Sequence, residues 1–456
     1  MTSWANDRLP ELIWAALLVT RLERHQALAL FRQIADYCST IGPSGPGFGI
    51  THSAMATLGG SILEGLLRVI CVDPASRQAL MPLTILPDLP ARDYWITALG
   101  QTTPRIADDE ELWNKLGLAV ARTLFHQSQE ATDCRWIRVL AAAAAGRLHF
   151  VRDTETAKEI FGYPDYGDIR KVRPTIRAAE GALDSLDPRN PTAKSHWSSA
   201  FWQHCLRDTQ CKSPQADQDF NPAQVGPSVV RVRAVYEGLV DHCSETRTTT
   251  DIDAKHDTVF GIALYSLSFL DELYRPGVSN SGLGRSALRT MVELLVTLKY
   301  LVSVDTPDMW KVFRNYGLGQ AKLAFLKLSS SEIEPGYVDL DALEEMANED
   351  AWMEFVPINL GNWGKMNLRT MSIRGDCKEI YDQYYDWTSA FVHGHWGAVR
   401  DVVFQFCLNP LHRLHRIPRG YPRQQEDVIQ DACMILDHIM EEIDRVYPPF
   451  QLRLLS

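Results

Sequence analysis

Closely spaced cysteines, which mark zinc sites and redox motifs, are missing from this sequence. The nine cysteines are scattered along 456 residues without a CxxC pair. Cys205 and Cys211 lie near His204, but no second pair of ligands follows them at zinc spacing. Free thiols are typical of proteins that stay in a reducing compartment. We therefore expect reduced cysteines, no bound metal and no cofactor.

Long apolar runs are also missing. Residues 139–146 form one of the longest, and they are far shorter than the ~20 residues that a membrane-spanning helix needs. The N-terminus has no basic segment followed by an apolar one, so it does not resemble a secretion signal. We expect a cytoplasmic protein with no membrane partner.

Familiar catalytic and nucleotide-binding motifs are absent as well: the chain has no Walker loop, no kinase motif set and no Ser-His-Asp elbow. Residues 281–286, Ser-Gly-Leu-Gly-Arg-Ser, contain two glycines but follow no strand, which excludes a dinucleotide fingerprint. They open a helix instead. N–H groups at a helix start, together with Arg285, would suit an anion.

The sequence also lacks an excess of positive charge. The formal net charge is −11, which argues against a protein that coats nucleic acid over its whole surface. Residues 170–177 and 412–423 form two basic runs that could contact the phosphates of a nucleic acid locally. A solvated loop would carry such charges equally well.

Helical periodicity dominates what is present, and little of the chain alternates like a strand. The length of 456 residues allows about two or three domains. We predict an all-α, multi-helix protein with two helical parts: an N-terminal domain over residues 1–210, a polar, proline-containing linker over 211–227, and a C-terminal domain over 228–456. We predict helices over residues 10–38, 53–70, 109–126, 134–151, 170–186 (with Pro174 in its first turn), 194–209, 229–242, 255–274, 286–304, 308–328, 376–399 and 425–446, and an acidic surface segment over residues 338–348.

The helix over residues 286–304 is apolar on nearly every side, which is typical of a buried helix. It nevertheless carries Arg289 and Glu293. These two residues are one turn apart on the same face. A buried carboxylate is unfavourable unless it is paired. We therefore expect the two side chains to form a pair.

A second polar row follows on the helix over residues 376–399. Tyr385, Ser389 and His393 recur every fourth residue, which places a phenol, a hydroxyl and an imidazole on one face. If this helix packs against the Arg289 helix, a polar cluster forms inside an apolar core. The cluster is either a site in which His393 is an acid or base and Arg289 holds an anion, or a buried network that fixes helix packing.

Two neighbouring segments could extend such a site. Gly394 is expected to loosen or end the helix and so to expose His393 and His395. Further upstream, residues 248–257 place hydroxyls and acids beside Lys255 and His256. That segment is either a functional loop or an N-capping segment.

The C-terminal half resembles a bacterial helical family of unknown function. The resemblance rests on Arg289-Thr-Met-Val-Glu293 and on Ser389-Ala-Phe-Val-His393-Gly394, and residues 250–256 and 314–322 look like further family blocks. Lys255, His256, Tyr316 and Lys322, which lie in these blocks, are candidate binding residues together with Arg285 and His395.

That family in turn is distantly similar to the HEPN helical domains, many of which are RNA-cleaving toxins or phage-defence effectors. Their nucleases carry an arginine a few residues before the catalytic histidine, whereas Asp386, Trp387 and Thr388 precede His393 here. In this interpretation Arg289, on the neighbouring helix, supplies the cation.

The resemblance implies a HEPN-like C-terminal bundle, action on RNA or a nucleotide, and a homodimer. His393 would then act on the 2′-hydroxyl or the leaving oxygen, with Arg289 stabilising the phosphorane. Tyr385 and Ser389 would position groups, and Glu293 would hold Arg289. The alternative is a non-catalytic helical scaffold, or a sensor that binds a nucleotide or a protein.

Overall fold

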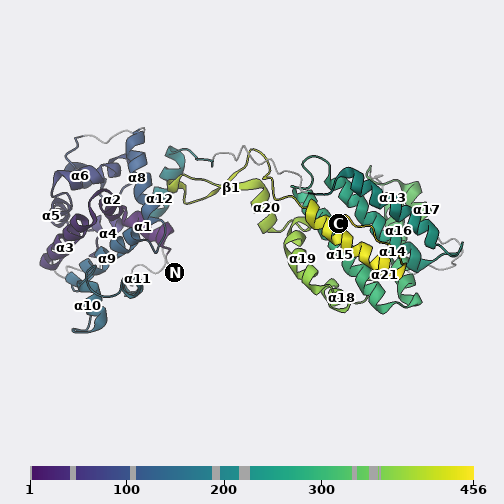
Figure 1. Cartoon of the computed structure of the whole chain (residues 1–456). Helices are drawn as coiled ribbons and strands as arrows, with labels where there is room; N and C mark the ends of the chain where they lie inside the picture. Colours follow the sequence, from purple (N-terminus) through teal and green to yellow (C-terminus); the bar gives the residue numbers. More distant parts are fainter. Residues whose placement is uncertain are drawn as a thin grey trace. The chain divides into compact units, whose positions relative to one another are not determined.

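Helices make up most of the protein. The computed structural model describes residues 3–41, 48–102, 109–186, 196–214, 226–330, 336–348, 358 and 361–455. Within these ranges the chain is mostly α-helical, which confirms the predicted fold class (Figure 1). Strands β1 (Phe404–Phe406) and β2 (Arg416–Pro418) pair in a two-stranded sheet. None of the described helices combines the length and apolar composition that a membrane span requires.

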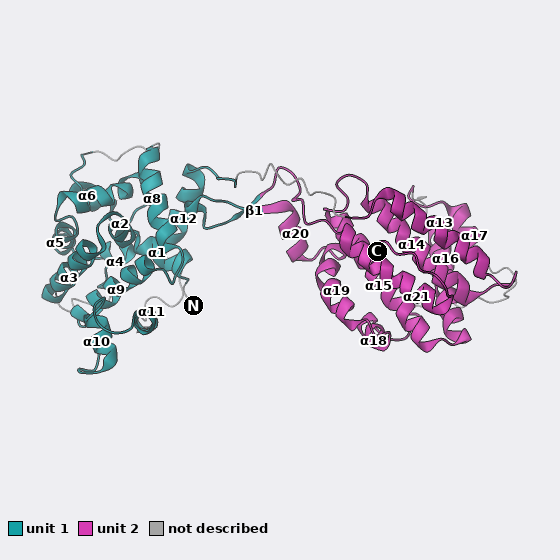
Figure 2. Cartoon of the chain, viewed as in Figure 1, with its two compact units in different colours: residues 1–215, 405–417 teal, residues 216–404, 418–456 magenta. Residues whose placement is uncertain are grey.

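The chain divides into two units, each with its own hydrophobic core (Figure 2). Unit 1 contains residues 1–215 and 405–417, and unit 2 contains residues 216–404 and 418–456. The second half of the chain therefore contributes a short segment to unit 1 and then returns to unit 2. The predicted C-terminal domain over 228–456 includes this segment, 405–417, whereas in the structure it belongs to unit 1. Most of the proposed linker over 211–227 lies outside the described residues.

Unit 1 packs its helices around a core rich in Trp, Leu and Ile. Polar residues start several of these helices: Asp109, Ser128 and Thr154 each accept a hydrogen bond from a backbone N–H of the first turn. The helical segments of unit 1 are η1 (Trp4–Arg8), α1 (Leu9–Glu11), α2 (Ile13–Arg21), α3 (Arg24–Ile41), α4 (His52–Met55), α5 (Gly60–Ile70), α6 (Pro74–Leu80), η2 (Met81–Ile85), α7 (Arg92–Ala98), α8 (Glu110–Thr123), α9 (Gln129–Ala144), α10 (Glu155–Phe161), α11 (Ile169–Leu186), α12 (His196–Asp208) and η3 (Pro410–His412).

Unit 2 is built around α15, which packs against α14, α18, α19 and α21. Its start is capped by Ser281, and it ends at Asp305, whose positive φ of 39° turns the chain into the next helix. The helices of unit 2 are α13 (Val229–Thr246), α14 (Ala254–Leu273), α15 (Gly282–Val304), α16 (Pro307–Ser329), α17 (Leu340–Ala347), α18 (Leu368–Arg374), α19 (Lys378–Val392), α20 (Trp396–Val403) and α21 (Ile429–Val446).

Several predicted helices differ from the structure. The helix predicted over 53–70 is broken into α4 and α5, and the one predicted over 134–151 corresponds to α9, which ends at Ala144. The helix predicted over 10–38 is broken into α1, α2 and α3, with extended backbone at Leu22. The helix predicted over 376–399 is two helices, α19 and α20, because Gly394 adopts a left-handed conformation with a φ of 61°. Pro174 lies inside α11 and not in its first turn, since that helix already begins at Ile169.

Candidate functional site

Helices α15 and α19 pack side by side and carry the polar residues that the sequence singles out. Most apolar side chains of α15 are buried, including Leu288, Met291, Val292 and Leu295. The prediction that this helix is buried is therefore confirmed. Tyr384 of α19 anchors the pair to α21, because its hydroxyl donates a hydrogen bond to Asp431 over 2.7 Å.

Arg289 lies at the interface of the two helices and is only 5% exposed. Its Nη1 forms an ion pair with Oε1 of Glu293 over 2.5 Å, but the geometry of this contact is not that of a hydrogen bond. The Nε of Arg289 has no hydrogen-bond partner in the described part of the chain. Its Cζ lies over the Tyr385 ring, 3.6 Å from the centroid. A cation over a ring face is attracted by the ring quadrupole. The guanidinium is thus held by one carboxylate and one aromatic ring.

Glu293 departs from the expectation of a buried carboxylate. Its side chain is 44% exposed, whereas that of Arg289 is 6% exposed. The difference follows from the direction of the two side chains: the arginine extends beneath Tyr385, and the glutamate remains at the solvent edge of α15. The carboxylate therefore keeps part of its hydration while it pairs with a buried cation.

Tyr385 is itself part of an aromatic stack on α19. Its ring lies 4.3 Å from that of Tyr381, with 25° between the planes. Burial raises the pKa of the Tyr381 phenol, and the neighbouring Tyr385 and Asp386 add to the effect. Arg289, Tyr385 and Tyr381 thus form a layered cluster in which a cation and two rings fix the packing of α15 against α19.

His393 lies at the other end of the polar row and is exposed. The row becomes more accessible toward the end of α19, since Tyr385 and Ser389 are half-buried. In the described part of the chain the imidazole of His393 has no hydrogen bond or ion pair with Arg289. The predicted polar cluster inside an apolar core is therefore not formed as a single unit: the arginine end is buried and the histidine end is open.

A tight turn fixes the two histidines beside each other. The N–H of His393 donates to the carbonyl of Ser389 over 3.1 Å, and the N–H of His395 donates to the carbonyl of Ala390 over 2.9 Å. Gly394 supplies the left-handed residue that this helix ending requires. The two imidazole rings are stacked with centroids 5.8 Å apart and planes 28° apart. Both rings face solvent, as the glycine predicts.

Large aromatic side chains border the histidine pair. Trp387 is 55% exposed and Trp396 is 61% exposed. The Trp387 ring lies against Gly397 at the start of α20, which couples the two helices on either side of the turn. Arg400 follows Trp396 by one turn, is exposed, and has no ion-pair partner among the described side chains. Unit 2 thus presents two imidazoles, two indoles and one guanidinium on α19, α20 and the turn between them.

Arg285, which we expected to bind an anion, is buried, and its guanidinium donates hydrogen bonds to backbone carbonyls. Its Nη1 donates to the carbonyls of Ser279 and Ser281 over 3.1 and 3.3 Å, and its Nη2 donates to the carbonyl of Glu426. Burial lowers the pKa of this guanidinium, and nearby carboxylates partly oppose the effect. Arg285 therefore ties the start of α15 to the segment that precedes α21.

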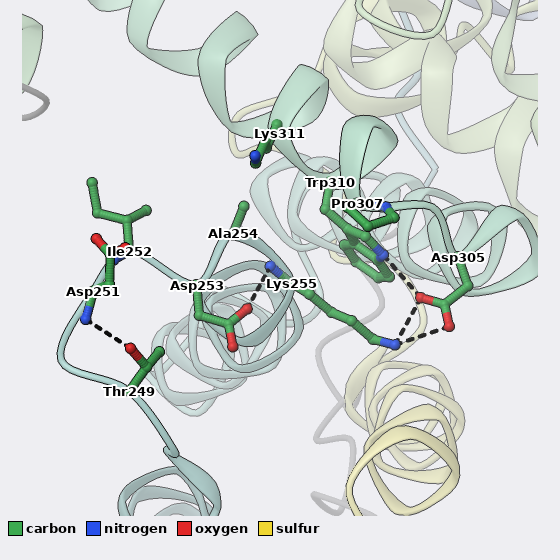
Figure 3. A pocket seen from close by; sticks show the side chains of 10 residues that line it. All are labelled: Thr249, Asp251, Ile252, Asp253, Ala254, Lys255, Asp305, Pro307, Trp310 and Lys311. Carbon is green, nitrogen blue, oxygen red and sulfur yellow. Dashed lines mark hydrogen bonds and ion pairs between the residues drawn. The ribbon is translucent and has the colours of Figure 1, made fainter. Parts of the chain in front are cut away.

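Lys255 borders a hollow of about 430 Å³ at the start of α14 (Figure 3). Its ammonium is 2.7 Å from Oδ1 of Asp305, which also accepts a hydrogen bond from Nε1 of Trp310 over 3.0 Å. The hydrogen bond from Lys255 is the main cause of the lowered pKa of Asp305. The hollow is lined by Thr249, Asp251, Ile252, Asp253, Ala254, Lys255, Asp305, Pro307, Trp310 and Lys311. Lys255 thus tethers α14 to the turn between α15 and α16.

His256 points the other way, into the core, and is 2% exposed. Its Nε2 is 3.1 Å from Oγ1 of Thr246, and its ring packs against Phe260 and Tyr447. Burial is the main cause of its lowered pKa. Asp253 caps α14 through the N–H groups of Lys255 and His256. The segment over 248–257 therefore serves as an N-cap in this structure, beside the hollow.

Tyr316 and Lys322 lie on α16, which packs mainly against α14 and α17. Both side chains are half-buried. In the described part of the chain neither has a hydrogen bond, ion pair or ring contact with Arg289 or His393. The structure does not join these two residues to the α15–α19 cluster.

Four residues that sequence reasoning missed converge in unit 1: Cys211, Cys407, His412 and His415. Cys205 and His204 lie near Cys211 in sequence but are not members of this cluster. The spatial partners of Cys211 come from the 405–417 segment, far along the chain. The His-x-x-His spacing of 412–415, five residues after a cysteine, was the available signal.

Comparison with known proteins assigns no activity. Residues 280–406 match the model of a family of unknown function, DUF5677. The matched stretch contains Arg289 to Glu293 and Ser389 to Gly394, so the resemblance to an uncharacterised family is confirmed there. No curated protein and no solved structure matches the chain.

Proposed function

We propose that unit 2 acts on RNA as a metal-independent ribonuclease of a defence or stress response, distantly related to HEPN domains. The observation that carries the proposal is the histidine pair: two exposed imidazoles lie 5.8 Å apart in a turn fixed by backbone hydrogen bonds. Histidine titrates near neutral pH, so one ring can accept a proton while its neighbour donates one.

The reaction is a transphosphorylation. His393 removes the proton of a ribose 2′-hydroxyl, whose oxygen attacks the adjacent phosphorus. The bond from phosphorus to the 5′-oxygen breaks, and His395 gives its proton to that leaving oxygen. The products are a 2′,3′-cyclic phosphate and a 5′-hydroxyl. At the end of the reaction His393 is protonated and His395 is neutral, the reverse of the starting state.

The surroundings of the pair suit single-stranded RNA. Trp387 and Trp396 are 55% and 61% exposed, and exposed indoles stack on unpaired bases of any sequence. Arg400 is exposed one turn after Trp396, where its guanidinium can bind a phosphate and stabilise the charge of the phosphorane.

Arg289 takes a positioning role in this proposal. It is 5% exposed, and its guanidinium already pairs with Glu293 and lies over the Tyr385 ring. It fixes α19, the helix that leads to His393, against α15.

The test is cleavage of a labelled, unstructured RNA by the purified full chain in buffer without magnesium. We expect the wild type to cleave it with a bell-shaped pH profile and to leave cyclic phosphate ends. His393→Ala and His395→Ala should each lower the rate by about 100-fold or more. Trp396→Ala should weaken RNA binding about 10-fold, the loss of one stacked base.

The matched control is His438→Ala. His438 is a partly exposed histidine of the same unit whose Nδ1 lies 2.9 Å from a carboxylate oxygen of Glu441. Its removal should leave cleavage unchanged. A wild type that cleaves no RNA, or histidine variants that cleave as fast as His438→Ala, would rule out the ribonuclease.

The same surface supports a second candidate function, an interface for a protein or for a second copy of the chain. Apolar side chains at the end of α19 and on α20 are exposed: Val392, Val399 and Val403. Such residues together with exposed tryptophans are typical of interfaces. Light scattering at several protein concentrations distinguishes the two: a dimer that Trp396→Ala dissociates, without RNA cleavage, favours the interface.

A further inference from the structure

A cluster of two cysteines and two histidines lies in unit 1, apart from the histidine pair of unit 2. Cys211 follows α12, Cys407 follows β1, His412 ends η3 and His415 precedes β2. The ligand atoms of all four side chains lie within 4.8 Å of one another. The cluster thus joins the end of α12 to the 405–417 segment.

The spacing of these atoms suits a tetrahedral metal site. With zinc–sulfur and zinc–nitrogen bonds of about 2.3 and 2.1 Å, neighbouring ligands of a tetrahedron are about 3.4–3.8 Å apart. Here Sγ of Cys211 is 3.5 Å from Nδ1 of His412 and 3.3 Å from Nε2 of His415. Sγ of Cys407 is 3.3 Å from the same Nδ1 of His412. The ligand atoms therefore already occupy nearly the positions that a bound ion requires.

Hydrogen bonds around His412 select the tautomer that a metal needs. The hydroxyl of Thr209 donates its only proton to the carbonyl of Cys205 over 2.6 Å and accepts from Nδ2 of Asn409 over 3.0 Å. Its oxygen can only accept from His412, whose Nε2 is 3.0 Å away. Nε2 therefore carries the proton, and Nδ1 directs its lone pair at the two sulfurs. Ligating histidines are oriented in this way by an outer hydrogen bond.

The backbone around the cluster is also fixed. The N–H of Lys212 donates to Sγ of Cys407 over 3.4 Å and so holds the sulfur in place. The N–H of Cys407 donates to the carbonyl of His415 over 2.9 Å, and that of Leu408 to the carbonyl of Lys212 over 2.7 Å. Three of the four side chains are buried or half-buried, and Cys211 is exposed. An ion can thus enter from the Cys211 side into a largely preformed site.

We propose that Cys211, Cys407, His412 and His415 bind one Zn²⁺ ion in a closed, structural site. Two thiolates and two imidazoles are the ligand set that zinc favours, and four protein ligands leave no position for a substrate. The ion would hold the 405–417 segment in unit 1, against the end of α12. The expectation of no bound metal, drawn from cysteine spacing, does not anticipate this site.

The first test is the metal content of the untagged full chain, purified under reducing conditions and measured by mass spectrometry of the elements. We expect about one zinc per chain in the wild type, and less than about one-tenth in Cys407→Ser and Cys211→Ser. Cys243→Ser is the control, because Cys243 is a half-buried free cysteine of unit 2. It should retain the full zinc content.

A second measurement keeps the proposal testable if Cys407→Ser fails to fold. Zinc is removed from the wild type with a chelator, and Co²⁺ is titrated in. We expect the strong visible bands of tetrahedral cobalt and a thiolate charge-transfer band, both reaching a plateau at about one equivalent. His415→Ala should shift these bands, whereas His438→Ala should not.

The proposal is overturned if the wild type contains no zinc and gives no tetrahedral cobalt spectrum, or if Cys211→Ser and Cys407→Ser keep the wild-type zinc content. A disulfide between Cys211 and Cys407 that persists through purification under reducing conditions would overturn it as well. These outcomes are independent of RNA cleavage, which depends on residues of unit 2.

Discussion

The guanidinium of Arg289 lies over the ring of Tyr385, with Cζ 3.6 Å from the ring centroid. This contact joins α15 to α19, and the ion pair with Glu293 completes it. Arg289 is thereby removed from solvent, while His393, two turns beyond Tyr385 on the same helix, stays exposed.

The Arg289–Tyr385 contact depends on the aromatic face and not on the phenol hydroxyl. Tyr385→Phe should therefore change the free energy of unfolding by less than about 0.5 kcal/mol, whereas Tyr385→Leu should lower it by about 1–2 kcal/mol, since a desolvated cation–π contact is lost. Denaturant unfolding of both variants measures this difference. Equal losses in the two variants would show that the hydroxyl, and not the ring face, matters.

Two glycines of the first turn of α15 should respond differently to alanine. A Cβ at Gly284 would lie 2.6 Å from the carbonyl oxygen of Ser279 and 2.7 Å from that of Val278, and these backbone atoms cannot move aside freely. Gly284→Ala should therefore destabilise unit 2 by about 1–3 kcal/mol. At Gly282 the nearest atom is Cδ1 of Phe391 at 3.6 Å, an ordinary contact. Gly282→Ala, compared in the same thermal melts, should be neutral or slightly stabilising.

His52 should make unit 1 less stable in mild acid. Complete burial lowers its pKa from 6.5 to about 3, and neither ring nitrogen has a hydrogen-bond partner among the described residues. Below about pH 6.5 the unfolded chain binds a proton that the folded chain does not bind. The free energy of unfolding should therefore fall by about 2 kcal/mol between about pH 7 and pH 5 from this group alone.

His52→Leu tests this pH dependence. Leucine should remove the contribution of His52 and keep the apolar contacts with Trp95 and Trp197, whose rings lie 5.3 and 6.0 Å from the imidazole. Urea unfolding followed by tryptophan fluorescence at pH 7 and pH 5 measures how the free energy of unfolding changes with pH. His25→Gln, at an exposed position of α3, is the control. An unchanged slope in His52→Leu would contradict the prediction.

Glu180 is a buried carboxylate of unit 1 that pairs with three arginines, of which Arg135 is buried and Arg8 and Arg138 are half-buried. It is fully buried, and its carboxylate oxygens lie 2.7 Å from Arg8, 3.2 Å from Arg135 and 3.3 Å from Arg138. Glu180→Gln removes the negative charge that pairs with all three cations, and it should destabilise unit 1 by about 3 kcal/mol.

Glu237→Gln is the control for Glu180, because Glu237 forms an exposed ion pair with Arg233 within α13. That substitution should change the free energy of unfolding by less than about 0.5 kcal/mol. Calorimetry of both variants measures the contrast. Similar melting in the two variants would mean that the three arginines find other partners.

The sequence by itself determined the features that depend on residues close together in the chain. Apolar residues at helical spacing predict the helices, and the unbroken apolar surface of residues 286–304 predicts that α15 is buried. The four-residue interval between Arg289 and Glu293 predicts their ion pair. Gly394 predicts the end of α19 and the exposure of His393 and His395.

Only the tertiary structure decided which distant residues meet and how deeply each side chain is buried. Arg285 and Lys255 are engaged by groups from other segments, and Glu293 stays at the surface while Arg289 does not. Cys211 meets Cys407, His412 and His415 because residues 405–417 return to unit 1. The physical reason is that spacing along a chain fixes geometry over a few turns of helix. Contacts across hundreds of residues depend on how whole helices pack.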